Sequence, residues 1–164
     1  MDLAMVAVET LLIGVHDGHL TYRAAEESLA DNEHPDAAAR RLAGFGPPFG
    51  PPFGPPVNGR LIHSTSWRFD GGRIVLTYAA LPDPDPATAQ RFPALGATTA
   101  TGTALNPSPP HVDRADVIAH AARHLAFLHR TDPAVAEAAL EHPPLWALLD
   151  AYQPDVAGPV RPLR

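Results

Sequence analysis

The chain of 164 residues contains no cysteine and no lysine, so all 12 of its basic residues are arginines. Without cysteine it can form no disulfide, no thiolate zinc site, no iron–sulfur cluster and no cysteine nucleophile. Acidic residues number 18, the net charge is −6, and no stretch of the sequence is strongly basic. Because a basic stripe supplies most non-specific affinity for DNA, we expect no nucleic-acid partner.

Long apolar runs are also missing. The most apolar stretch covers the first 15 residues, but it carries Asp2 and Glu9 and lacks a basic start and a clear cleavage site. A membrane-spanning helix needs about 18–20 apolar residues, and a signal peptide needs a basic n-region. We therefore expect a cytoplasmic protein with no membrane partner. Arginine without lysine, with abundant alanine and proline, is typical of GC-rich genomes such as those of actinobacteria, and indicates no function.

Proline is unusually frequent, with 20 in the chain. Proline lacks the backbone N–H and fixes φ, so it is excluded from most helix and strand interiors. It is concentrated in residues 44–59, where Phe-Gly-Pro-Pro occurs three times, and in residues 82–111. The sequence predicts one domain over residues 1–157, interrupted by a Pro/Gly-rich loop at 44–59 and a flexible segment at 82–111, with a tail at 158–164.

Two hairpins are predicted in the first half of the chain. The apolar run from Met5 to Val15 leads into Asp17-Gly18, a strong signal for a type I′ turn, and residues 20–23 form the return strand. Because the first strand is apolar on both faces, we expect it to be central in a sheet. Residues 60–80 alternate with period two around the turn Asp70-Gly71-Gly72 and predict the second hairpin.

Helices are predicted between the hairpins and in the last third of the chain. Pro35 near the start and Gly44 at the end delimit a short helix, while residues 24–30 contain good helix formers without a clear stripe. Asp113 is a good N-cap for a helix ending near His129, and Asp132 for a second one. A third helix is predicted over residues 145–152. The fold class is therefore α+β, with an antiparallel or mixed sheet from two hairpins, a short helix between them and a helical C-terminal third.

The strand over residues 60–70 carries the candidate ligand-binding residues His63, Ser66, Trp67 and Arg68. Simple alternation places His63 and Trp67 on one face and Ser64, Ser66 and Arg68 on the other, so His63 could not readily activate either serine. Arg68 could meet an anionic ligand, or it could form an ion pair with Glu9. Trp67 is expected to be core or a pocket wall. No Gly-x-Ser-x-Gly motif is present, so the catalytic residues are unknown.

His120 and His124 are four residues apart on the main predicted helix, the spacing of helical metal ligands. Ala121 follows the first histidine, so the signature with a glutamate at that position is absent. Histidine near a helix C-terminus can also simply complement the helix dipole. We therefore expect no metal and no cofactor, and keep a metal-dependent hydrolase using this pair as an alternative.

A hairpin, a helix carrying HPDAAARRLAGFG and a hairpin ending RIVLTYAALPDP follow one another in residues 2–83. This order resembles the Nudix hydrolase fold. Arg40 could take the place of the family's helical arginine, but residues 41–45 supply none of the glutamates that hold magnesium. The resemblance thus implies a member without the family's active site.

The function expected from the sequence is a non-catalytic, cytoplasmic, Nudix-like binding or interaction module with a small-molecule or protein partner. The strand bearing His63, Trp67 and Arg68 would form its pocket. A scaffold that engages a partner through the Phe-Gly-Pro-Pro repeats at 45–56 is the remaining alternative.

Overall fold

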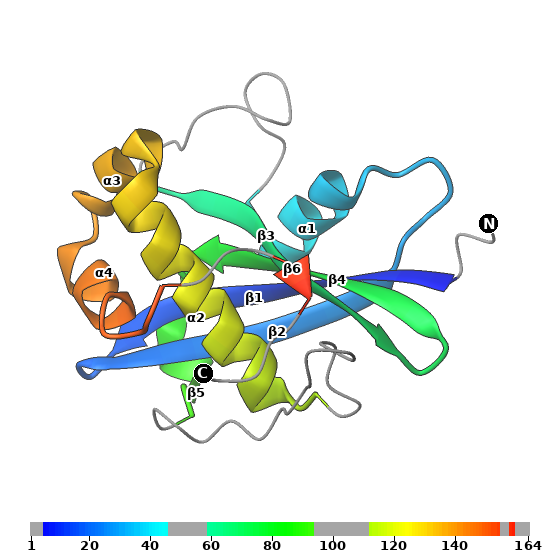
Figure 1. Cartoon of the computed structure of the whole chain (residues 1–164), viewed down its shortest axis with the longest axis horizontal. Helices are drawn as coiled ribbons and strands as arrows, with labels where there is room; N and C mark the ends of the chain where they lie inside the picture. The colour runs from blue at the N-terminus through cyan, green and yellow to red at the C-terminus, as the bar shows by residue number, and fades with distance from the viewer. Residues whose placement is uncertain (1–4, 46–58, 94–111, 155–157, 160–164) are drawn as a thin grey trace.

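A mixed β-sheet organises the chain, and a computed structural model describes it for residues 5–45, 59–93, 112–154 and 158–159 (Figure 1). Within these residues the sheet has six strands in the order β5-β2-β1-β4-β3-β6. The strands are β1 (Val6–His16), β2 (His19–Ser28), β3 (Leu61–Asp70), β4 (Arg73–Leu81), β5 (Gln90–Arg91) and β6 (Gly158–Pro159). The helices are α1 (Pro35–Ala43), the short 3-10 helix η2 (Pro86–Thr88), α2 (Arg114–Thr131), α3 (Pro133–Ala139) and α4 (Pro143–Leu149). The predicted α+β class is confirmed.

Strands β1 and β2 form the first predicted hairpin. Its loop residues Asp17 and Gly18 have φ of 51° and 75°, so both central positions are left-handed, as a type I′ turn requires. The return strand is longer than the predicted residues 20–23. Residues 24–28 continue the antiparallel ladder opposite residues 11–7 of β1, so pairing with β1 overrides their helix propensity.

Strand β1 is central, as predicted, because it pairs with β2 on one side and with β4 on the other. The β1–β4 pairing is parallel, whereas β3 and β4 form the second predicted hairpin around Gly71 and Gly72. The parallel contact between the two hairpins makes the sheet mixed.

The predicted capping residues are confirmed, although α2 ends two residues later than predicted, at Thr131, and α4 covers Pro143–Leu149 instead of residues 145–152. Gly44 has φ of 69° at the C-cap of α1 and donates its N–H to the Arg41 carbonyl, at 3.1 Å. Asp113 and Asp116 form a reciprocal capping box at the start of α2. Asp132 caps α3, and Pro143 occupies the first turn of α4, where its missing N–H costs nothing.

Each face of the sheet has its own core. On one face, alternate residues of β1 and β4 pack against α2, α3 and α4. The largest buried side chains there are Leu11, Ile13, Leu81, Ile118, Leu125 and Trp146. On the opposite face, Val8 and Tyr78 pack against Ala38 and Ala39 of α1. The alternation of buried residues on β1 therefore serves two separate helical layers.

The segment after β4 contains ordered elements, although the sequence predicts no structure there. In residues 82–93 it forms η2 and then β5, which pairs with Thr21 and Tyr22 of β2. Asp83 donates its N–H to the Ile13 carbonyl at 2.8 Å and accepts from Nε of Arg23 at 2.9 Å. Gly14 permits this close approach, since a Cβ there would lie 2.9 Å from the Asp83 Cβ. A segment held in place by the polar contacts of one buried aspartate has no periodic pattern, so the sequence could not reveal it.

Three other predictions fall partly or wholly outside the described residues. The Phe-Gly-Pro-Pro repeats at 45–56 lie outside the described residues except for Phe45. The Phe45 ring packs against Leu12 and Ala80, and its centroid lies 5.3 Å from the Arg60 guanidinium carbon. Residues 94–111 also lie outside. In the predicted tail, Gly158–Pro159 forms β6 against β3. Among the described residues no helix is long and apolar enough to cross a membrane.

Candidate functional site

A β-bulge in β3 decides which of the candidate residues share a face of the sheet. Ser64 lies opposite Tyr78 and Ser66 lies opposite Thr77, so Thr65 is an extra residue in β3. A single extra residue reverses the alternation for the rest of a strand. The Thr65 hydroxyl is buried and donates to the Thr77 carbonyl at 3.3 Å.

The predicted grouping of the β3 side chains is therefore wrong beyond residue 64. Arg68 and His63 both lie on the α2 face of the sheet, because Arg68 contacts Glu9 there and His63 contacts His124. Ser66 is two residues before Arg68 and therefore shares that face. Trp67 lies on the opposite face, because it pairs with Leu76, whose side chain packs on the α1-side core. His63 and Trp67 thus do not line one pocket.

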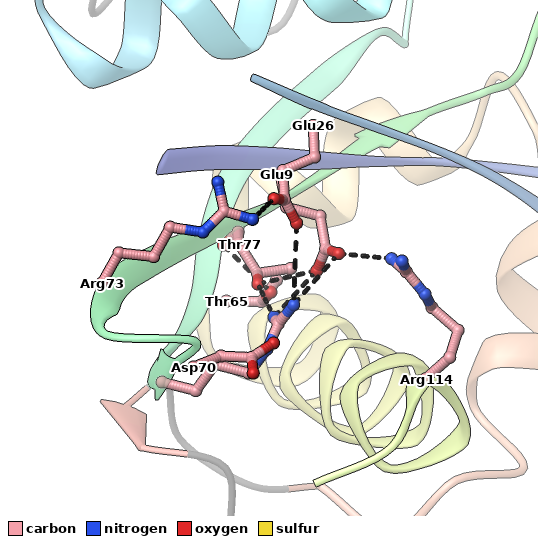
Figure 2. Close-up of polar contacts among 8 residues, drawn as sticks. Glu9, Glu26, Thr65, Asp70, Arg73, Thr77 and Arg114 are labelled. Atoms are coloured by element: carbon pink, nitrogen blue, oxygen red, sulfur yellow. Dashed lines mark hydrogen bonds and ion pairs between the residues drawn. The ribbon is translucent and has the colours of Figure 1, made fainter. Parts of the chain in front are cut away.

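Glu9 is the centre of a polar cluster between the sheet and the start of α2 (Figure 2). Its side chain is fully buried on β1. Arg68 donates from Nη1 to one carboxylate oxygen at 3.0 Å and from Nη2 to the other at 3.3 Å. Thr77 on the intervening strand donates to the first oxygen at 3.1 Å, and Arg114 of α2 binds the second. The predicted ion pair between Arg68 and Glu9 is confirmed, and it crosses over β4.

Three further charges complete this Glu9 cluster nearer the hairpin turn. Arg73 forms an ion pair with Glu26, whose carboxylate also lies 3.9 Å from Nη2 of Arg68. Asp70 lies 3.8 Å from Nε of Arg68. Three arginines therefore face three carboxylates, so the cluster is balanced in charge. Arg68, with a side chain only 11% exposed, has its donors directed at protein carboxylates rather than at solvent.

His63 and His124 form a second polar contact between β3 and α2. Nδ1 of His63 lies 2.8 Å from the Ser64 carbonyl and 3.3 Å from Nε2 of His124. A carbonyl oxygen only accepts, so Nδ1 of His63 is the donor in its contact with Ser64. Phe127 stacks on the His124 ring with centroids 6.1 Å apart. This contact joins the strand to the middle of the helix.

The predicted metal pair lies on α2, and both rings are buried. His120 is fully buried and His124 faces His63, so the two helix positions point inward as the four-residue spacing implies. In the ranges that the structure describes, no group of three or more histidine, aspartate or glutamate side chains could hold a metal ion.

The α1 face of the second hairpin carries exposed aromatic side chains. Trp67 is 44% exposed and Phe69 is 70% exposed. Trp67 lies opposite Leu76, and Phe69 lies opposite Ile74. Leu76 and Ile74 are partly exposed, so the two pairs form one apolar patch on this face. We call these four residues the open apolar strip. Of the two places expected for Trp67, the core is wrong, because α1 covers the sheet around Val8 and Tyr78 and leaves Trp67 exposed, and the pocket wall stays a prediction.

Sequence reasoning missed several residues of these sites. Arg114 sits at the first position of α2, directly after the capping Asp113, and only the fold brings it to Glu9. Phe69 was placed on the strand but not in the candidate site.

Ser66, a predicted ligand contact, is 3% exposed, and its hydroxyl has no hydrogen-bond partner among the described residues.

Comparison with protein-family models, with curated proteins and with solved structures found no match to the chain.

Proposed function

We propose that this chain is a non-catalytic interaction module of Nudix-like fold, and that a protein partner binds to the open apolar strip. This proposal rests on the exposure of Trp67 and Phe69, which lie on one face of the sheet beside the apolar side chains of the neighbouring strand. Exposed apolar rows on a sheet are typical of interaction sites. Aromatic side chains are also over-represented among the residues that dominate binding energy.

The polar contacts between β3 and its neighbours β1 and α2 support binding rather than catalysis. Both oxygens of Glu9 accept hydrogen bonds from arginines, so the contacts of this carboxylate are with side chains of the fold itself. His63 contacts the His124 ring and the Ser64 carbonyl through its Nδ1. In α1, the residues after Arg40 include no glutamate, so the carboxylates that serve Nudix chemistry have no counterpart in this helix.

The test compares two surface variants of the whole chain. Because the chain has no lysine, amine-reactive biotin attaches it to a support only through its N-terminus. Proteins of the source cell that bind are identified, purified and measured again by calorimetry. The double variant Trp67→Ser/Phe69→Ser should bind at least about 30-fold more weakly, since each buried aromatic contributes on the order of 1–2 kcal/mol.

The matched control is Leu140→Ser. Leu140 is 76% exposed at the end of α3, so this change removes an exposed apolar side chain elsewhere and should leave binding unchanged. Equal binding by the wild type and the double variant would contradict the proposal. Turnover of a nucleoside diphosphate derivative with magnesium by the purified chain would contradict its non-catalytic part.

A further inference from the structure

Among the described strands, only the two-residue β6 pairs with the outer edge of β3. One side of β3 pairs with β4 along the whole hairpin. On the other side, β6 pairs at two positions, Ser66 with Gly158 and Trp67 with Pro159. No other described strand lies beside β3. The backbone groups of an open strand edge are a template for a further strand.

The pairing of β6 shows that this edge accepts an extended segment, and that its present occupant is a weak one. Glycine and proline have low strand propensity. Proline has no N–H, so Gly158 supplies the only N–H of β6. Two paired residues contribute little compared with the five or six of an ordinary strand.

The two faces of β3 define the chemistry of a better occupant. Trp67 and Phe69 lie on the apolar side of the edge, whereas Ser66 and Arg68 lie on the polar α2 side. A strand placed along this edge presents its side chains alternately to these two sides. The complementary segment therefore alternates apolar and polar residues.

We propose that an extended segment of a protein partner, with alternating apolar and polar residues, adds to the outer edge of β3 in the place of Gly158–Pro159. This inference rests on the proposed function and specifies how the partner is recognised. Strand addition gives affinity through the backbone and specificity through alternate side chains. The row Trp67–Phe69 then contacts the apolar side chains of the added strand.

The chain's own tail competes with the partner in this arrangement. A tethered segment acts at an effective concentration that reaches millimolar values for a short linker. Releasing the tail should therefore increase the affinity of the edge for a strand added in trans. We expect an increase of about tenfold, because even a weak occupant held at such a concentration competes.

The probe is a fluorescein-labelled peptide with the sequence of residues 155–164, and its binding is followed by fluorescence anisotropy. It is titrated into the full chain and into a chain that ends at Pro154. The described core clusters reach no further than Tyr152, so the shorter chain keeps every side chain of the core. The shorter chain should bind the peptide saturably and about tenfold more tightly than the full chain.

A second variant keeps the full length. Gly158→Pro removes the remaining N–H of β6 and should raise peptide affinity in the same direction. A peptide of scrambled order is the control for composition. Amide hydrogen exchange should show protection of β3 by the probe, with β2, on the opposite side of the sheet, unchanged.

Absence of saturable binding to a folded chain ending at Pro154, or equal affinity for both chains, overturns the strand-addition proposal. Self-association of the shorter chain that excludes the peptide also overturns it, because the edge then accepts a second copy. A partner that depends on Trp67 and Phe69 but binds both chains equally would leave the proposed function intact and remove only strand addition.

Discussion

The pair of Glu9 and Arg68 gives the sharpest test of the buried polar cluster. Arg68→Met removes the charge and keeps an unbranched apolar stem of similar length. Glu9 then keeps Arg114 and Thr77 as partners, but it loses the two bonds of 3.0 and 3.3 Å that reach both of its oxygens. The Glu9 side chain has no exposed surface in the intact chain, so these bonds are not made in competition with bulk water.

The expected cost follows from which charges remain paired. Breaking a buried ion pair by removing one partner costs about 3–5 kcal/mol. Arg114, whose side chain is 43% exposed, compensates part of the charge, so we expect the lower end, about 3 kcal/mol. For a chain of this size that corresponds to a decrease in Tm of about 6–12 °C.

The double variant Glu9→Leu/Arg68→Met separates the charge effect from packing. It removes the Glu9 carboxylate together with the Arg68 guanidinium, so we expect a total loss of only about 1 kcal/mol, because replacing both members of a buried pair by apolar residues is often nearly neutral. Urea unfolding is followed by circular dichroism and by the fluorescence of the buried Trp146. A double variant as unstable as the sum of Glu9→Leu and Arg68→Met would refute the reasoning, since the two residues would then be uncoupled.

Two further predictions concern other parts of the sheet. Gly14→Ala should destabilise the chain by about 1–3 kcal/mol in urea unfolding, because its Cβ would lie 2.9 Å from the Asp83 Cβ and 3.2 Å from the Pro86 Cβ; an unchanged midpoint would contradict the close packing. The hydrogen bond from Arg41 lowers the pKa of Glu27 below its ordinary value of 4.5, so stability that is present above pH 4.5 is lost as the pH falls through the lower folded pKa. In an NMR titration, Arg41→Gln should return the Glu27 pKa toward 4.5, and an unmoved titration would exclude the pair in solution.

Local sequence signals predicted the elements whose causes are local. Asp17-Gly18 fixes the first turn, Gly44 ends α1, and Asp113 with Asp116 begins α2, each through contacts within a few residues. The central place of β1 was also predictable, because a strand with apolar residues on both faces needs cover on both. The exact end of β2 was not, since residues 24–28 are strand only through their pairing with β1.

The candidate site was predictable only in part. Periodicity located the strand and indicated the pair of Arg68 with Glu9. It could not reveal the bulge at Thr65, because one extra residue leaves both halves of the pattern intact and changes only their relation. Trp67 was consequently assigned to the wrong face, and Phe69 was overlooked. Arg114 was missed because its contact with Glu9 joins residues 105 positions apart.

The parallel contact between β1 and β4 has a consequence for how the chain folds. Each hairpin closes over a short turn, whereas the bond between Thr77 and Glu9 joins residues 68 positions apart. Closing that loop costs entropy that grows only with the logarithm of its length. We expect the two hairpins to form early and their docking to limit the folding rate. Insertions between α1 and β3 should then change folding speed only slightly, which makes this connection the natural place for the chain to lengthen.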